Sequence, residues 1–172
     1  HGWFEALISS DAQKYVASTP FNKPGTIPLE FSTEIKDGCP LDCGLCPEHE
    51  QHVCMPILEI TDHCDLECPV CLVRNRRSFH LSRAQVAATL DRPIASEGRS
   101  DILNLSGGEP TMNPAFREIV EECCGRKEVL FVSVSTNGLR LARDPGLLKF
   151  LADRGVILSL QFDGLRDDVY QA

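Results

Sequence analysis

Three cysteines follow one another in the spacing CxxxCxxC, at Cys64, Cys68 and Cys71. Three thiolates this close together can bind one corner of an iron–sulfur cube and leave its fourth iron without a protein ligand. An iron with an open coordination position can bind a substrate or a cofactor directly. The alternative is a zinc site, which needs a fourth ligand such as His63 or His80. The motif therefore predicts a metal centre with a chemical role.

A second group of four cysteines precedes this motif, and it consists of Cys39, Cys43, Cys46 and Cys54. Four thiolates can complete a tetrahedral shell around zinc, a single rubredoxin-like iron or a complete iron–sulfur cluster. A closed shell leaves no reactive position, so we predict a structural or electron-relay role. We call residues 39–54 the metal knuckle.

The use of cysteine and the net charge restrict the class of protein. Seven of the nine cysteines lie between Cys39 and Cys71, a pattern that suits metal binding in a reducing compartment better than a disulfide scaffold. We therefore expect a cytoplasmic protein. A net charge of −8 argues against a nucleic-acid surface or a zinc-ribbon nucleic-acid binder. No apolar run reaches about 20 residues, so no transmembrane segment is expected.

Apolar runs alternate with helix-start signals along the rest of the chain. We expect helices to begin at Ser82, Asn113 and Asp144. The predicted strands lie at residues 57–60, 102–105, 129–134 and 156–162. Such alternation indicates an α/β fold with a parallel sheet. We predict two parts, an N-terminal segment over residues 1–54 that contains the metal knuckle and a sheet domain over residues 55–172.

Polar turns follow the predicted strands at the edge where ligands bind in such sheets. The second strand ends in Ser106-Gly-Gly-Glu-Pro110, and the third ends in Ser135-Thr-Asn-Gly138. The cysteine motif itself follows the first strand. Because the chain stops at Ala172 with an exposed parallel edge, we expect either that the sequence is part of a longer protein or that something else covers that edge.

The order of CxxxCxxC after the first strand and Gly-Gly-Glu-Pro after the second resembles the radical S-adenosylmethionine (SAM) superfamily. The resemblance implies a partial (βα) barrel with a [4Fe–4S] cluster on Cys64, Cys68 and Cys71. It also implies that SAM binds the fourth iron and is cleaved to a 5′-deoxyadenosyl radical, which abstracts hydrogen from a substrate. The residues implied to contact SAM are Gly107, Gly108 and Glu109 at the amino group, Ser135 and Asn137 near the carboxylate or ribose, and Gln161 with Asp163 at the ribose.

The metal knuckle, followed closely by the second motif, is similar to one branch of that superfamily, which includes tetraether lipid synthase and pterin methyltransferases. The branch implies either carbon–carbon coupling of lipid chains or methylation, on a small-molecule or lipid substrate. It implies a low-potential electron donor such as ferredoxin or flavodoxin, and membrane association if the substrate is a lipid. The alternative is a non-catalytic interaction module on a degenerate barrel, against which the intact Gly-Gly-Glu-Pro turn argues.

Overall fold

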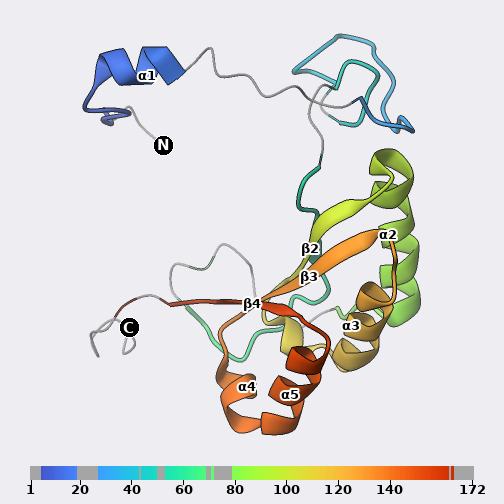
Figure 1. The fold of residues 1–172 in the computed structure, drawn as a ribbon. Helices are drawn as coiled ribbons and strands as arrows, with labels where there is room; N and C mark the ends of the chain where they lie inside the picture. The colour runs from blue at the N-terminus through green and yellow to red at the C-terminus, as the bar shows by residue number, and fades with distance from the viewer. Residues whose placement is uncertain are drawn as a thin grey trace.

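A sheet of four parallel strands forms the centre of the computed structural model (Figure 1). The structure describes residues 5–18, 27–42, 44–49, 53–68, 71, 79–162 and 164. The strands pair in chain order, and they are β1 (Ile57–Glu59), β2 (Ser100–Ser106), β3 (Val129–Thr136) and β4 (Ile157–Leu160). The predicted α/β class with a parallel sheet is confirmed.

Helices connect successive strands, as parallel pairing requires. They are α2 (Arg83–Glu97), the short 3₁₀ helix η1 (Pro110–Met112), α3 (Phe116–Cys124), α4 (Leu139–Arg143) and α5 (Pro145–Asp153), and a further helix, α1 (Ala12–Ser18), precedes β1. Two predicted helix starts are confirmed. Ser82 and Gln85 form a capping box at the start of α2, and the Asp144 side chain accepts a hydrogen bond from the Leu147 amide at the start of α5.

The third predicted helix start is wrong by two residues, because α3 begins at Phe116 rather than at Pro114. The Asn113 amide oxygen accepts from the Ala115 amide, but its nitrogen donates to the carbonyl oxygens of Ile60 and Leu81, at 2.8 and 2.9 Å. The side chain of this buried asparagine thus provides hydrogen bonds for two carbonyl oxygens and one backbone amide. Asn113 therefore joins the chain around β1 to the start of α3.

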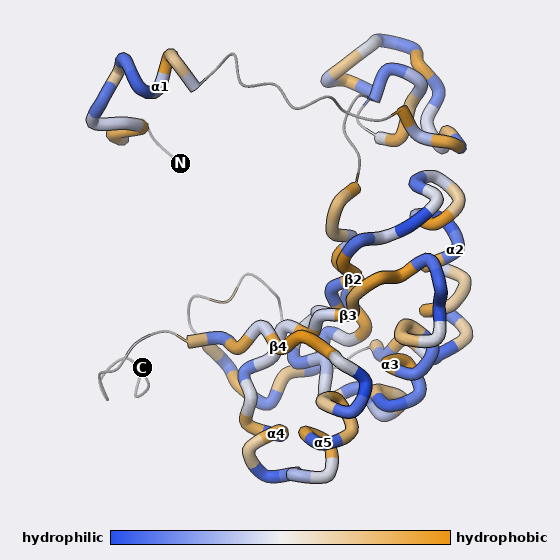
Figure 2. The backbone as a smooth tube through the Cα atoms, viewed as in Figure 1, coloured by the Kyte–Doolittle hydropathy of each residue, from blue (hydrophilic) through white to orange (hydrophobic). Residues whose placement is uncertain are grey.

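The hydrophobic core lies between the sheet and its covering helices. The tube in Figure 2 is also orange along β4, whose residues are exposed and do not belong to this core. Alternate residues of β2 and β3 face this core, whereas the residues between them face the other side of the sheet. The buried core residues from the strands and the helices include Leu103, Leu105, Val132, Val134, Val86, Leu90, Ile119, Val120, Cys123, Leu147 and Leu151. One face of the sheet is thus covered by helices.

The N-terminal part contacts the sheet domain at the end of α2. The Leu29 amide donates to the Ser96 carbonyl at 2.7 Å, and Pro28 is buried. No helix among the residues that the structure describes is long and apolar enough to cross a membrane.

Candidate functional site

The loop that carries the three-cysteine motif begins directly after β1. We call residues 60–80 the cysteine loop; the structure describes residues 60–68, 71, 79 and 80 of it. Cys64 is half-buried, whereas Cys68 and Cys71 are exposed, and the Cys71 amide donates to the Cys68 carbonyl at 3.1 Å. Burial is the main cause that raises the pKa of the Cys64 thiol. All three thiols belong to one loop at the carboxyl end of the sheet.

The Gly-Gly-Glu turn after β2 packs against the start of the cysteine loop. The Gly108 amide donates to the Thr61 carbonyl at 2.8 Å, and the Glu109 amide donates to the His63 carbonyl at 2.7 Å. A Cβ atom on Gly108 would lie 2.5 Å from the His63 carbonyl oxygen, and one on Gly107 would overlap the Thr61 carbonyl oxygen. Gly107 also has a φ of 138°, which side chains rarely adopt. Both glycines are needed for this contact.

The Glu109 side chain points into the protein and is 1% exposed. Its Oε1 accepts from the amide and the hydroxyl of Thr111, at 3.1 and 2.7 Å, and from the Thr136 hydroxyl at 2.8 Å. Its Oε2 accepts from the Asn137 amide at 2.8 Å. A buried carboxylate needs such partners. Glu109 therefore joins the ends of β2 and β3, and the turn's backbone is the part that lies beside the cysteine loop.

Asn137 joins the end of β3 to the cysteine loop. Its Nδ2 donates to Oδ1 of Asp65, the residue after the first cysteine, and its Oδ1 accepts from the Leu139 amide. Asp65, Thr111 and Thr136 are site residues that the sequence reasoning missed. They were missed because residue spacing within one motif does not predict which residues of another motif it will contact.

The remaining residues predicted to contact SAM lie farther along the same edge of the sheet. Ser135 is half-buried and forms hydrogen bonds with the side chain of Asn104. Gln161 is exposed just after β4, and its amide donates to the Thr136 carbonyl at 2.9 Å. Asp163 lies outside the described residues. Ser135, Asn137 and Gln161 thus all lie at carboxyl ends of strands, where the parallel fold was expected to place them.

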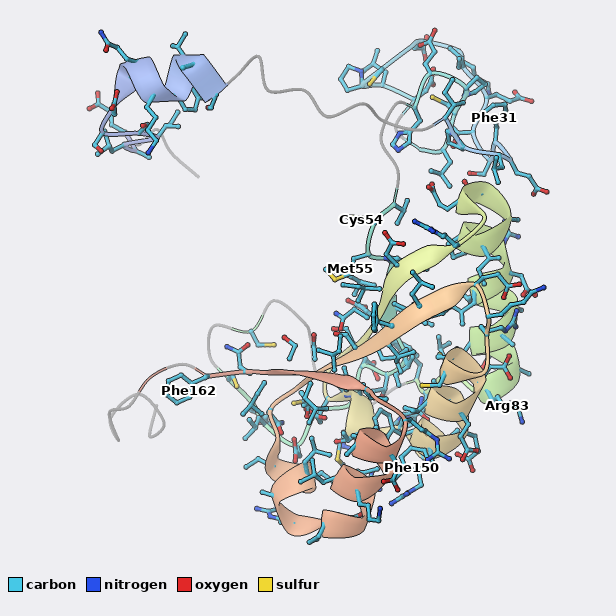
Figure 3. All side chains as sticks on the ribbon, viewed as in Figure 1. Phe31, Cys54, Met55, Arg83, Phe150 and Phe162 are labelled. Carbon is cyan, nitrogen blue, oxygen red and sulfur yellow. The ribbon has the colours of Figure 1, made fainter. Side chains whose placement is uncertain are left out.

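The metal knuckle lies apart from this edge of the sheet, and Figure 3 shows Cys54 and Met55 on the segment that leads from it into the sheet. Cys46 is buried, Cys39 and Cys54 are exposed, and Cys43 lies outside the described residues. Among the residues described, no group of three or more His, Cys, Asp or Glu side chains is placed to hold a metal ion.

One carboxylate orders the first turn of the metal knuckle. Oδ2 of Asp42 accepts hydrogen bonds from the backbone amides of Lys36, Asp37 and Gly38, at 2.7, 2.7 and 2.8 Å. These bonds lower the pKa of the Asp42 carboxyl, because they stabilise its charged form. The turn that presents Cys39 therefore has a defined backbone in the part of the chain that the structure describes.

The residue types and spacing of the cysteine loop fit an iron–sulfur cluster, although its three described thiols are not placed as a group that could hold a metal. The loop offers thiols on one short segment, and two of the three are exposed. The adjacent Gly-Gly-Glu backbone and the polar ends of β3 and β4 lie on the same edge of the sheet. Three protein thiolates would leave one iron of a four-iron cluster open to a further ligand.

Comparison with known proteins agrees with this geometry. Residues 58–172 match the family model described as the radical SAM superfamily. The chain is 29% identical to 7,8-dihydro-6-hydroxymethylpterin dimethyltransferase of Methanocaldococcus jannaschii, over 99% of this chain and 34% of that protein. It is 31% identical to GTP 3′,8-cyclase of Pelotomaculum thermopropionicum, over 66% of this chain and 35% of that enzyme. The chain thus spans about a third of the length of these relatives.

Proposed function

This chain belongs to the radical SAM superfamily, and we propose that it supplies the cluster and SAM site of an enzyme that cleaves SAM reductively. When bound, the cluster would supply one electron for reductive cleavage of the C5′–S bond of SAM, the chemistry that yields methionine and a 5′-deoxyadenosyl radical able to take a hydrogen atom from a substrate. Cys64, Cys68 and Cys71 would bind the [4Fe–4S] cluster. The electron would come from a low-potential donor such as ferredoxin or flavodoxin.

The observation that supports this proposal is the contact between the Gly-Gly-Glu turn and the cysteine loop. Two backbone hydrogen bonds, from Gly108 to Thr61 and from Glu109 to His63, hold the turn against the residues that precede Cys64 in the chain. Backbone groups of Gly107 and Gly108 would then bind the SAM amino group beside the cluster. The buried Glu109 carboxylate would orient this backbone from the inside rather than contact SAM.

The polar groups at the ends of β3 and β4 would bind the rest of SAM. We assign Ser135 and Asn137 to the neighbourhood of its carboxylate or ribose, and Gln161 with Asp163 to the ribose. The second amide hydrogen of Asn137 and the hydroxyl of Ser135 are suitable donors for a carboxylate. Ser135, Asn137 and Gln161, which the structure describes, lie on the edge of the sheet where the cysteine loop begins.

For the end reaction we propose methyl transfer to a small molecule of the pterin kind. The supporting observation is that the similarity to the M. jannaschii pterin dimethyltransferase extends over 99% of this chain, and so includes the metal knuckle. Carbon–carbon coupling of lipid chains, with an association of the enzyme with membranes, is the other reaction that the branch resemblance implies, and no contact in the described residues favours it. The knuckle would bind a second metal centre through Cys39, Cys43, Cys46 and Cys54.

Formation of 5′-deoxyadenosine tests the proposal directly. The full-length protein is reconstituted anaerobically with iron and sulfide, then given SAM and dithionite. We expect 5′-deoxyadenosine from the wild type and none from Cys64→Ala, Cys68→Ala or Cys71→Ala. Cys124→Ala, on α3, is the matched control and should keep the activity. Product from a variant that lacks all three cysteines would contradict the assignment, and it would favour a non-catalytic role for the motif.

A further inference from the structure

The face of the sheet that turns away from the helices carries an ordered set of polar side chains. Leu103 and Leu105 of β2, like Val132 and Val134 of β3, belong to the core under the helices. Because side chains alternate along a strand, the residues between them lie on the opposite face. Asn104 is one of these residues. In a (βα) barrel this opposite face is the interior, where substrates bind near the carboxyl ends of the strands.

The strand register aligns the side chains of this interior face into rows. Nearest the amino ends, Ser100 pairs with Val129, and Ile102 then pairs with Phe131. The next row contains Ile57, Asn104, Ser133 and Ile157. The row closest to the carboxyl ends contains Glu59, Ser106, Ser135 and Ser159. From the pair of Ile102 with Phe131 onward, the rows change from apolar, through mixed, to entirely polar toward the edge that carries the cysteine loop. The polar end of this face is therefore the end beside the proposed SAM site.

Asn104 is the most constrained member of this polar set. It is 7% exposed, and its Oδ1 accepts from the Ser133 hydroxyl at 2.9 Å. The Ser135 hydroxyl oxygen lies 3.1 Å from its Nδ2 and 3.2 Å from its Oδ1. These contacts with two serines of the next strand fix the plane of the amide. The second hydrogen on Nδ2 and the remaining lone pairs of the two hydroxyls can still pair with a bound molecule.

We propose that Asn104, Ser133 and Ser135 form the part of the substrate site that recognises a flat nitrogen heterocycle, an inference that rests on the proposed function above. The remaining hydrogen on the Asn104 nitrogen and the serine hydroxyls could form hydrogen bonds with nitrogen and oxygen atoms along the edge of such a ring. The fixed amide plane would orient the ring in front of the SAM site. Ser133 and Asn104 would form hydrogen bonds with the edge of the ring, and Ser135 would lie between the substrate and SAM.

An aliphatic chain would fit this surface poorly. Covering the exposed or half-buried polar side chains of the row closest to the carboxyl ends with hydrocarbon would remove water from them without giving new hydrogen bonds. Each such group costs about 1–3 kcal/mol when it is buried without a partner. The polar rows therefore favour a hydrogen-bonding substrate over a lipid chain as the molecule that reaches the radical.

Binding measurements on the full-length reconstituted protein with SAM test the inference. The probes are 7,8-dihydro-6-hydroxymethylpterin and, separately, phosphatidylcholine vesicles with saturated chains. We expect the wild type to bind the pterin, and Asn104→Leu to raise its Kd by about 5- to 150-fold, the range that corresponds to about 1–3 kcal/mol. Ser133→Ala, a smaller change that leaves the fold less disturbed, should raise Kd by about 2- to 10-fold. Ile102→Val, on the same face but in the apolar row, is the control and should leave Kd unchanged.

The outcomes separate this inference from the proposed function. A wild type that forms no 5′-deoxyadenosine with SAM and dithionite would overturn the proposed function. A wild type that forms it but fails to bind the pterin, or binds the vesicles instead, would overturn the inference alone. Equal pterin affinity in the wild type, Asn104→Leu and Ser133→Ala would also overturn it.

Discussion

Asn137 donates a hydrogen bond of 2.7 Å from Nδ2 to Oδ1 of Asp65, and this bond links the end of β3 to the cysteine loop across 72 positions of sequence. The backbone amide of the same asparagine donates to the buried Glu109 carboxylate at 2.8 Å. Asn137 is therefore the residue through which the turn after β2, the end of β3 and the cysteine loop are connected. The position of Cys64 relative to the Gly-Gly-Glu turn depends partly on this connection.

Asn137→Ala should disturb the proposed cluster site more than the fold. Loss of one hydrogen bond costs about 0.5–1.5 kcal/mol, so the free energy of unfolding should change little. The same free energy would weaken SAM binding by about 2- to 10-fold if the bond orders the cysteine loop. The measurements are the SAM dissociation constant and the SAM-induced change in the electron paramagnetic resonance spectrum of the reduced cluster.

Asp65→Ala provides the matched comparison for this effect. If the two residues act through their shared bond, Asp65→Ala should weaken SAM binding as Asn137→Ala does, and the double variant should be no worse than either single one. Additive losses would instead show that Asn137 contacts SAM through a separate interaction. Either single variant with wild-type affinity would exclude a positioning role.

Glu109→Ala should destabilise the protein strongly. The carboxylate accepts four hydrogen bonds while nearly fully buried, and the alanine variant leaves Thr111, Thr136 and the Asn137 amide without this acceptor. Bonds to charged groups contribute about 1.5–3 kcal/mol each, and their losses are not additive, so we expect a decrease of about 2–4 kcal/mol in the free energy of unfolding. Urea denaturation monitored by circular dichroism measures it.

Glu118→Ala is the control for this experiment, because Glu118 is an exposed glutamate in the first turn of α3. It should change the free energy of unfolding by less than about 0.5 kcal/mol. A Glu109→Ala protein that is as stable as this control but no longer binds SAM would show that the carboxylate contacts SAM directly.

Cys123 should make stability fall at alkaline pH. Burial is the largest cause that raises the pKa of its thiol from the ordinary value of 9.0 to about 12. The unfolded state therefore releases this proton first as pH rises, and the native state loses stability from about pH 9 upward, by at most about 1.4 kcal/mol for each pH unit. Below about pH 9 the Cys123 thiol is protonated in both the native and the unfolded state, so its titration takes no stability from the native state.

Unfolding free energies of the wild type and Cys123→Ala at about pH 8 and about pH 10.5 measure this effect. The substitution itself leaves a small cavity, so the informative quantity is the difference between the two pH values rather than either value alone. The wild type should lose more stability than the variant over this interval. Equal losses would mean that the thiol titrates alike in both states, and native Cys123 would then react readily with iodoacetamide.

The sheet and the starts of α2 and α5 could be predicted from the sequence because their signals are local. The Ser82–Gln85 capping box and the Asp144-Pro145 start each lie within a few residues, and the apolar runs mark the strands. Asn113 looks like a helix cap for the same local reason. Its bonds to the carbonyls of Ile60 and Leu81 depend on chain brought close by the sheet, which no local pattern encodes.

The same distinction applies to the candidate site. Its position at the carboxyl ends of parallel strands follows from the order of motifs and strands. The direction of the Glu109 side chain does not, because it is determined by Thr111 and Thr136 on two further elements. The sequence motif suggests that the Glu109 carboxylate binds the SAM ammonium group. In the fold, this carboxylate instead accepts four hydrogen bonds from within the protein.

The two cysteine groups should behave as separate metal sites. A knuckle of about 16 residues cannot bury enough apolar surface to fold alone, so metal binding would have to supply the folding free energy. The described part is consistent with this, since its order comes from polar bonds such as those of Asp42, while Leu41 is exposed. The knuckle leads into β1 through Met55, so its loss should loosen the start of that strand.

Cys43→Ser and Cys54→Ser should therefore each remove one metal equivalent and lower the thermal stability of the full-length protein. The cluster on Cys64, Cys68 and Cys71 should remain visible by electron paramagnetic resonance after reduction, with a signal that changes when SAM is added. His49→Ala, within the knuckle but not among its four cysteines, is the control and should keep both metal equivalents. If Cys54→Ser erased the SAM-responsive signal in a protein that stayed folded, the two cysteine groups would form one shared site, because a separate structural centre would have no reason to remove the three thiolates of the cysteine loop.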